Sequence, residues 1–443
     1  MRIEDTDQER LVPGGKEMIL KELRWFGIVP DEKPLVQSER LELYKRFARD
    51  LVKRGHAYYC FCSEARLEEL RKNQETSKKP PRYDRYCLGL SQKEIEEKLR
   101  GGQSYVIRQK MPDKGKLKFI DLVRGELEFD LSLIDDSVLL KSDGFPTYHL
   151  ASVVDDHSME ITHVIRTEEW LSSTPKHILL HRSFGWQPPE YAHPPLVLNP
   201  DRTKMSKRLG NVSVASFRAA GYLPEALINF LVLLGWNPKT EQEFFTLKEL
   251  IEIFDISGIN KAGAVFDREK LDYFNNHYIR KYKPEELFEK IIGNSDDENF
   301  GRFKADKNFA VRVLRIIQPR LKTISFNEVW QNSFYFYDLP EYEAGILIFK
   351  KSDKERTLKG LRYLKTFIQN SDDKDWASPE SLNGLLQKAV KDVGLDNGDI
   401  FWPARAALSG LEKSSSPGEL FWVLRKEESL SRIKSALNKL TLI

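Results

Sequence analysis

Two lysines flank a small hydroxyl residue in the segment Lys204-Met205-Ser206-Lys207-Arg208, near the middle of the chain. A short apolar run and a polar turn precede this segment, which predicts a loop at the end of a strand. Two lysines on such a loop can surround a triphosphate and stabilise the charge on a departing pyrophosphate. The five residues are therefore candidate nucleotide-binding residues, with Lys204, Ser206 and Lys207 as the candidate catalytic groups. The alternative is a solvated basic turn.

Two further segments place charged and aromatic groups in comparable positions. The chain starts with Met1–Asp7 (MRIEDTD), and a later region contains Tyr148–Ala151 (YHLA) followed by Val164–Trp170 (VIRTEEW). In order and spacing, these segments and the lysine loop resemble the bacterial and mitochondrial type of glutamyl-tRNA synthetase, a class I aminoacyl-tRNA synthetase. The resemblance extends over nearly the whole length, including Leu233–Trp236 (LLGW) and Phe266–Leu271 (FDREKL).

The resemblance implies a reaction and its partners. Such an enzyme activates L-glutamate with ATP to glutamyl-adenylate and transfers it to the 3′-terminal adenosine of tRNA(Glu) for protein synthesis. ATP would bind at Lys204–Arg208 as a substrate, accompanied by Mg²⁺, although no side-chain site for the metal is evident. The resemblance also implies a monomer, and no membrane partner is expected.

The substrate amino acid needs partners for an ammonium group and two carboxylates. By resemblance, Glu4 meets the α-ammonium and Arg2 lies close to the substrate carboxyl groups; the alternative for both is a surface charge pair. Arg166, at a predicted strand end, would present a planar fork of donors to the γ-carboxylate, and an ordinary ion pair is its alternative. Tyr148 would bind the same substrate. Ser152 stands where relatives often carry Asn, which puts a substrate contact there in doubt.

Three cysteines, Cys60, Cys62 and Cys87, lie in one region of the sequence. Their spacing matches a zinc site of some family members, but the expected fourth ligand is Gly89. Structural zinc requires four protein ligands, so the cysteines are weak zinc candidates and zinc is not expected. The low, odd number of cysteines indicates a reducing compartment, the cytoplasm, with an organelle as the alternative.

Composition indicates a globular protein of several domains. The chain has 443 residues, 40% of them hydrophobic, and a net charge of +3, so binding to nucleic acid must depend on local basic patches. No apolar stretch approaches eighteen residues, and no signal peptide is evident. The helical carboxyl-terminal part contains basic residues that are candidates for contact with tRNA phosphates. The alternative is that they form solvated helix faces. These residues are Arg312, Arg315, Arg320, Lys322, Lys351, Lys354, Arg356, Lys359, Arg362 and Lys365.

Periodicity predicts an α/β part followed by an all-α part. A first helix is predicted after Gly14-Gly15, with Ile19, Leu23 and Phe26 as apolar positions and its end at Gly27. Further helices are predicted from an N-cap at Ser38 to Gly55 and from a cap at Thr174 to Gly185. Strands are predicted at 105–108, 126–131 and 162–166. By resemblance, the catalytic domain has an interrupted Rossmann-type nucleotide-binding fold. The expected parts are 1–57 and 146–215 (the catalytic domain), 58–145 (an inserted α+β acceptor-binding domain), 216–290 (a stem-contact domain) and 291–443 (a helical anticodon-binding domain).

One family element is missing from the sequence. The His-x-Gly-His element, with the helix and strand after it, would occupy roughly thirty or more residues, and the chain is expected to start at the end of the second strand. Each lost transition-state donor can lower the rate on the order of 10²- to 10³-fold, and several are missing, so the chain as given is expected to be inactive. The rival functions are an inactive tRNA-binding paralogue and an enzyme that glutamylates a modified tRNA base. A glutaminyl enzyme, with its β-barrel end, fits the helical pattern poorly.

Overall fold

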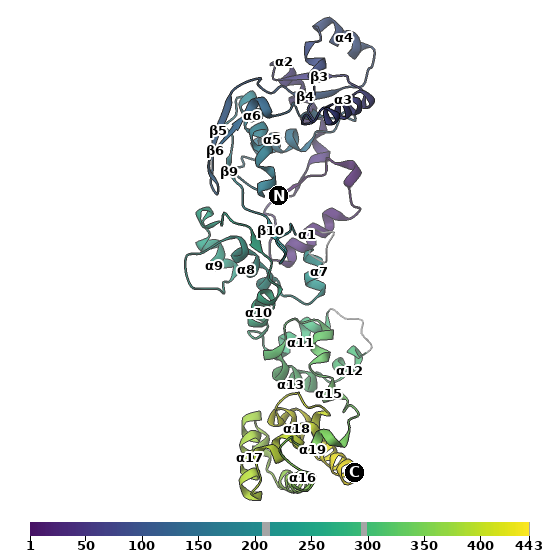
Figure 1. Cartoon of the computed structure of the whole chain (residues 1–443), viewed down its shortest axis with the longest axis vertical. Coiled ribbons are helices and arrows are strands. Elements are labelled where there is room, and N and C mark those ends of the chain that lie inside the picture. The colour runs from purple at the N-terminus through teal and green to yellow at the C-terminus, as the bar shows by residue number, and fades with distance from the viewer. Residues whose placement is uncertain (206–212, 294–298, 443) are drawn as a thin grey trace. The chain divides into compact units, whose positions relative to one another are not determined.

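The computed structural model describes residues 1–205, 213–293 and 299–442. The chain divides into two compact units, Met1–Leu209 with Leu231–Phe266 and Gly210–Phe230 with Asp267–Ile443. All described strands belong to the first unit, whereas the second is built of helices (Figure 1). The predicted combination of an α/β part and an all-α part is therefore confirmed. Among the described helices, none is long and apolar enough to cross a membrane.

The amino-terminal segment forms a small parallel pair of strands, β1 (Arg2–Ile3) with β2 (Leu35–Val36). The chain between them contains the 3-10 helix η1 (Gln8–Arg10) and helix α1 (Gly15–Trp25). Gly27 follows α1 with a φ of +77°, a conformation that glycine adopts without steric cost. The helix end predicted from Gly27 is confirmed.

The second predicted helix starts later than expected. A 3-10 turn, η2 (Gln37–Arg40), precedes α2 (Leu41–Lys53), so Ser38 lies outside the helix. The prediction that Ser38 is the N-cap is wrong. Its hydroxyl donates instead to Oδ2 of Asp5 at 2.6 Å, because a contact 33 residues away along the sequence competes with the local capping bond.

A three-stranded antiparallel sheet follows, in the order β3 (Ala57–Cys60), β4 (Val106–Gln109) and β7 (Val138–Leu140). Ile107 and Leu139 on this sheet are completely buried in one apolar cluster with residues of α2 and of α5 (Tyr148–Ser158). The strand predicted at 105–108 is confirmed within one residue. The cluster ties this sheet to α5, whose first residue is the candidate substrate contact Tyr148.

A second, four-stranded sheet has mixed direction, in the order β6 (Gly125–Asp130), β5 (Lys116–Asp121), β9 (Glu190–Ala192) and β8 (His163–Ile165). β5 and β6 form an antiparallel hairpin, whereas β9 is parallel to both β5 and β8. Figure 1 shows β5, β6 and β9 side by side along one edge of the unit. Residues predicted to belong to the inserted part, 58–145, thus share a sheet with residues of the predicted catalytic part.

Helix α6 (Thr174–Phe184) packs beside these strands and ends at Gly185, as predicted. Ile178 is buried with residues of the four-stranded sheet, while Leu180 and Phe184 belong to the cluster that contains α5. The prediction that Thr174 caps the helix is wrong, because Thr174 is its first helical residue and its hydroxyl donates to the backbone oxygen of Trp170. The amino-terminal end of α6 is therefore fastened to the preceding turn.

The first unit contains further short elements besides these two sheets. Strands β10 and β11 pair in parallel, and the lysine loop follows β10 in the sequence. Their bounds, with those of the other helices, are α3 (Glu64–Thr76), η3 (Tyr86–Gly89), α4 (Gln92–Arg100), η4 (Leu131–Leu133), η5 (Glu168–Ser173), β10 (Val197–Leu198), α9 (Leu247–Ile253), η6 (Ile256–Gly258) and β11 (Ala264–Val265).

The second unit is helical throughout its described part. Helix α8 (Pro224–Gly235) passes from it into the first unit. The other elements are α7 (Val214–Ala219), α10 (Arg268–Ile279), α11 (Pro284–Ile292), α12 (Phe300–Ala305), α13 (Lys307–Ile317), η7 (Gln318–Arg320), α14 (Phe326–Gln331), α15 (Phe334–Tyr337), η8 (Ala344–Leu347), α16 (Lys354–Gln369), η9 (Asp373–Trp376), α17 (Pro379–Val393), α18 (Asn397–Ser409) and α19 (Pro417–Thr441).

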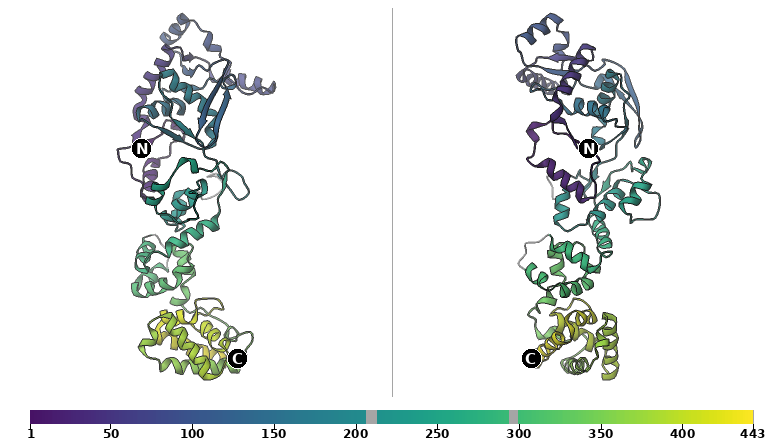
Figure 2. Two further views of the ribbon diagram at one scale, coloured as in Figure 1. Left: turned by 90° about the vertical axis from the view of Figure 1, so that its left-hand side faces the viewer. Right: turned by 180° about the vertical axis from the view of Figure 1, so that it is seen from behind.

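The last four helices form one packed bundle. α19 contacts α16, α17 and α18, and the two views of Figure 2 show these yellow and yellow-green helices as a single group. Two buried leucines, Leu361 and Leu386, face this core. α19 is interrupted at Arg425, whose φ of 63° and ψ of 176° are not helical.

Candidate active site

Arg166 follows β8 and is held by four side chains. Its Nε donates to Nε2 of His193 at 3.2 Å, and its Nη2 donates to the hydroxyl of Thr174 at 3.0 Å. Its Nη1 donates to Nδ1 of His177 at 3.1 Å and to the hydroxyl of Tyr148 at 3.3 Å. The residues come from β8, the end of β9 and the first turns of α5 and α6, so the packing of these elements places the guanidinium.

All four partners of Arg166 are neutral acceptors. Within the described part of the chain, no carboxylate forms an ion pair with this arginine, although it is half-buried. Burial and the charge of Arg166 hold the pKa of His177 well below its usual value. Burial likewise lowers the pKa of His149 to about 4, with Lys176 and Arg166 acting in the same direction. The charge of Arg166 is thus not compensated by a described carboxylate, and the site suits the binding of an anion.

The arginine also decides which ring nitrogens carry protons. A guanidinium can only donate, so Nδ1 of His177 accepts and the proton of this neutral ring is on Nε2. That Nε2 lies 2.9 Å from Nδ1 of His149 and donates to it. The chain of donors therefore runs from Arg166 through His177 to His149.

Tyr148 lies against Arg166, and its predicted contact with the substrate stays a prediction. Its ring is 4.5 Å from the ring of Trp170, and Trp170 in turn lies 5.6 Å from the guanidinium carbon of Arg166. Ser152 does not join this group: its hydroxyl donates to the backbone oxygen of Tyr148 at 2.7 Å and the residue is buried. The doubt about a substrate contact at Ser152 therefore has a structural basis.

Arg2 and Glu4 are joined to each other. The guanidinium of Arg2 donates to Oε1 of Glu4 at 2.7 Å and to Oδ1 of Asp156, near the end of α5, at 2.6 Å. No hydrogen bond or ion pair of the described residues connects them to Arg166 or Tyr148. The structure thus forms two groups, one around Arg166 and one around Arg2, both linked to α5.

The lysine loop is described only in part. Lys204 pairs with the carboxylate of Glu169 on η5, one residue before Trp170. The backbone nitrogen of Met205 donates to the oxygen of Val197 at 3.1 Å, which continues the β10 segment. Ser206, Lys207 and Arg208 lie outside the described residues. Lys204, the described end of the loop, is therefore anchored beside the Arg166 group.

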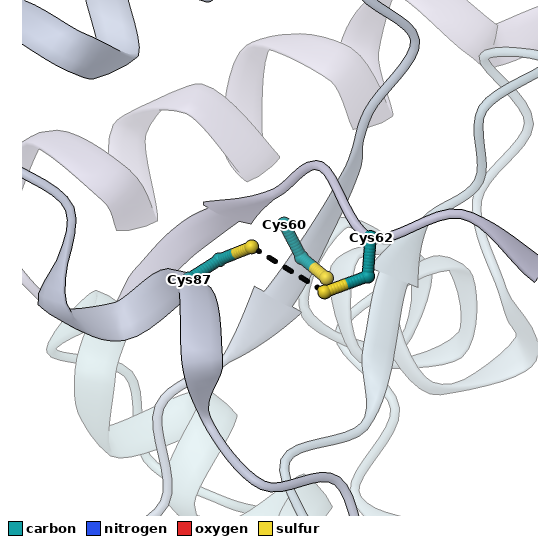
Figure 3. A group of neighbouring side chains, drawn as sticks. All are labelled: Cys60, Cys62 and Cys87. Atoms are coloured by element: carbon teal, nitrogen blue, oxygen red, sulfur yellow. Dashed lines mark hydrogen bonds between the residues drawn. The ribbon is translucent and has the colours of Figure 1, made fainter. Parts of the chain in front are cut away.

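The three cysteines converge in the first unit. Their sulfur atoms all lie within 4.8 Å of one another, and Sγ of Cys62 is 3.5 Å from Sγ of Cys87 (Figure 3). The hydroxyl of Tyr83 is 3.3 Å from Sγ of Cys60 and 3.4 Å from Sγ of Cys62. Three sulfur atoms and one oxygen therefore form a compact group, and the oxygen comes from a residue that the sequence analysis did not single out.

The surroundings of the cysteines favour a thiolate. Hydrogen bonds from Cys87, Tyr83 and Arg108 lower the pKa of Cys60, although burial opposes this. The hydrogen bond to Cys60 and burial raise the pKa of Cys87, while burial and the neighbouring sulfurs raise that of Tyr83. Three pairs of donor atoms are 3.3–3.5 Å apart and all three sulfur atoms lie within 4.8 Å of one another, separations compatible with a zinc ion that takes ligands at about 2.0–2.3 Å. The residues therefore fit such an ion, with Tyr83 in the place that Gly89 cannot fill.

The basic residues of the helical part differ in their surroundings. Arg320 is bound to the carboxylate of Glu419, and Arg356 pairs with Asp396 and Asp399. The charges of these two arginines are thus compensated by carboxylates of the same unit. Lys359 and Arg362 on α16 are exposed and form no ion pair with a described residue, so they remain candidates for contact with phosphates.

Several residues around Arg166 were not predicted from the sequence. His177, His193 and Thr174 contact it directly, and Asp121 on β5 contacts His193. The only signal available was the presence of several histidines between 149 and 193. Spacing alone does not reveal which of them face one side chain.

Two family models match the chain. The model described as "tRNA synthetases class I (E and Q), catalytic domain" matches residues 1–273, and the model described as "Anticodon binding domain" matches residues 278–437. The first match covers every described strand and the whole Arg166 group. The second covers the helices from α11 to most of α19.

Similar proteins cover the chain almost completely. A glutamate–tRNA ligase of Clostridium botulinum (strain Loch Maree / Type A3) is 41% identical, over 99% of this chain and 91% of that protein. One from Lachnoclostridium phytofermentans is 39% identical, over 100% and 91%. The crystal structure of a glutamate tRNA ligase from Elizabethkingia meningosepticum, in complex with its amino acid, matches with a TM-score of 0.83 and 31% identity, over 99% of this chain and 92% of that chain.

Proposed function

Because the chain belongs to the class I tRNA synthetases for glutamate and glutamine, we propose that it ligates L-glutamate to tRNA with the use of ATP. The observation that carries this proposal is the Arg166 group. A half-buried guanidinium surrounded by neutral acceptors attracts a carboxylate, and the side chain of glutamate supplies one. The family provides the reaction, and Arg166 provides the preference for an acidic amino acid.

Arg166 distinguishes glutamate from glutamine through its charge. The amide of glutamine cannot compensate the guanidinium, so binding glutamine would leave a positive charge unpaired in a largely desolvated site. Tyr148, whose hydroxyl already accepts from Arg166, lies where it can also contact the same substrate group. We assign Arg166 and Tyr148 to the γ-carboxylate.

Arg2 and Glu4 provide the second half of the amino-acid site. Glu4 is an exposed carboxylate suited to the α-ammonium group, and its present partner, Arg2, is a guanidinium suited to a carboxylate. A bound amino acid could exchange partners with this ion pair, since its two charged groups match the two side chains. Activation then requires the α-carboxylate to lie in line with the α-phosphorus of ATP.

The lysine loop is assigned to the triphosphate. Lys204 and Lys207 supply positive charge and Ser206 a hydroxyl donor, which stabilise the negative charge that develops on the leaving pyrophosphate. Glu169 forms an ion pair with Lys204 beside the proposed amino-acid site. Met205 and Arg208 complete the segment. Mg²⁺ accompanies the triphosphate in this proposal and neutralises part of its charge.

The parts of the chain are assigned to different regions of the tRNA. Residues 1–57 and 146–215 form the catalytic domain, and 58–145 holds the acceptor end. Residues 216–290 contact the stem, while the helices within 291–443 bind the anticodon region, in line with the family match over 278–437. Lys359 and Arg362 are the proposed phosphate contacts on α16.

A zinc ion is proposed for the cysteine group. The sequence analysis expected none because Gly89 stands in the fourth position, but the hydroxyl of Tyr83 supplies a fourth donor. Cys60, Cys62, Cys87 and Tyr83 would hold the ion, which would connect β3 to the 3-10 helix η3 and stabilise this part of the fold.

The full chain can be tested by incubation with tRNA, ATP, Mg²⁺ and labelled amino acids. We expect labelled glutamate on tRNA and a value of kcat/KM for glutamine about 10⁴-fold lower. Oxidation of the 3′-terminal ribose with periodate should abolish the labelling, whereas transfer to a modified internal base would survive it. Equal use of glutamine, or labelling without ATP, would contradict the proposal.

A further inference from the structure

The carboxylate of Asp121 is connected to Arg166 through hydrogen bonds to one intervening imidazole, that of His193. Oδ2 of Asp121 lies 2.6 Å from Nδ1 of His193, and Nε2 of the same ring accepts from Nε of Arg166 at 3.2 Å. Asp121 and His193 are 72 residues apart in the sequence and are brought together because β5 pairs with β9. Both residues are almost completely buried.

The carboxylate of Asp121 takes part in four hydrogen bonds. Oδ1 accepts from the backbone nitrogens of Val123 at 3.0 Å, Arg124 at 2.9 Å and His193 at 3.3 Å. The first two belong to the turn of the β5–β6 hairpin. Oδ2 is then left to the imidazole of His193. A carboxylate with this many donors has little freedom to rotate, so its direction is decided before any substrate binds.

The tautomer of His193 follows from its two neighbours. A carboxylate can only accept and a guanidinium can only donate, so the neutral ring must carry its proton on Nδ1 and leave Nε2 as an acceptor. The opposite tautomer would place an N–H against the N–H of Arg166. The pair therefore orients the guanidinium without compensating its charge, because Asp121 stays one residue away from it.

We propose that Asp121 and His193 are positioning residues for Arg166, which select the orientation in which its Nη atoms meet the γ-carboxylate of the substrate. This inference rests on the proposed role of Arg166. A carboxylate in direct contact with Arg166 would compete with the substrate, whereas an unsupported arginine would lose its direction. With the imidazole of His193 between Asp121 and Arg166, the carboxylate does not compete with the substrate, and the guanidinium keeps its orientation.

The kinetic test compares variants of the full chain with matched controls. Asp121→Asn should raise KM for glutamate about 10- to 100-fold, a typical cost for removing the support of a ligand, and should leave KM for ATP within about twofold. Asp130→Asn, at the opposite end of the same hairpin, is the control. His193→Leu should resemble Asp121→Asn, and His193→Gln, which keeps one donor and one acceptor, should recover part of the loss. His163→Gln, on exposed β8, is the control for these.

A second measurement does not depend on activity. Nitrogen-15 NMR of the histidine rings in the unchanged chain should show His193 protonated on Nδ1, assigned by the loss of its signals in His193→Gln. A proton on Nε2 would overturn the proposal, as would an unchanged KM for glutamate in both Asp121→Asn and His193→Leu. Failure of the unchanged chain to charge tRNA with glutamate would instead contradict the proposed function, so the two results are distinguishable.

Discussion

Lys204 forms an ion pair with Glu169, and Glu169 adjoins Trp170, whose ring lies 5.6 Å from the guanidinium carbon of Arg166. The start of the lysine loop and the candidate amino-acid site are therefore connected through η5. A triphosphate that attracts Lys204 has to compete with Glu169 for it. Occupation of one site can in this way alter the turn that supports the other.

The first prediction concerns Lys207, the lysine assigned to the pyrophosphate. Lys207→Ala should lower the rate of glutamate activation by about two orders of magnitude while the affinity for tRNA changes little, because the lysine acts on charge that develops in the transition state. Pyrophosphate exchange in the presence of tRNA measures this rate. An unchanged exchange rate would remove Lys207 from the proposed mechanism.

The second prediction concerns Arg166. Arg166→Lys should reduce kcat/KM for glutamate by at least about 100-fold, since the three donors of an ammonium group cannot replace the contacts with His193, His177 and Thr174 and also leave one for a carboxylate. KM for ATP should change little. Arg182→Lys, near the end of α6, is the matched control. Normal glutamate kinetics would show that Arg166 is a structural residue.

The third prediction concerns the cysteine group. Protein purified without chelators should contain about one equivalent of zinc per chain, measured by elemental analysis, and Cys60→Ser should lose it. Tyr83→Phe should release the metal at lower chelator concentrations, with Tyr86→Phe, an exposed neighbour, as the control. Zinc well below one equivalent would contradict the proposed ligand set. It would support the prediction from the sequence that no zinc binds, because Gly89 stands in the position of the fourth ligand.

The fourth prediction concerns pH and stability. Burial lowers the pKa of His181 to about 4, so between pH 6.5 and 4 the unfolded chain binds a proton at this residue that the folded chain does not. The free energy of unfolding must therefore fall as the pH decreases, by about 2 kcal/mol from this residue at pH 5. His181→Phe should reduce the loss, measured by urea unfolding at pH 7 and pH 5. His163→Gln is the control, and equal losses in all three proteins would contradict the assignment.

The sequence by itself predicted the chemistry of the candidate site. The lysine loop, Arg2 with Glu4, and Tyr148 with Arg166 were recognised because each motif is a short segment of characteristic residues. The ends of α1 and α6 were predicted from Gly27 and Gly185, since a helix end depends on the conformation of one or two residues. Such features are local, and a local pattern is sufficient to predict them.

The tertiary structure decided which groups support these residues. Asp121 reaches His193 only because a hairpin from the predicted insertion pairs with β9, and no periodicity in either segment specifies that pairing. Ser38 lost its predicted capping role for the same reason, since its hydroxyl donates to Asp5, 33 residues away in the sequence. The contact between Tyr83 and Cys60, 23 residues apart in the sequence, likewise depends on the tertiary structure. A contact between distant segments depends on the packing of whole elements, which the composition of a single segment does not determine.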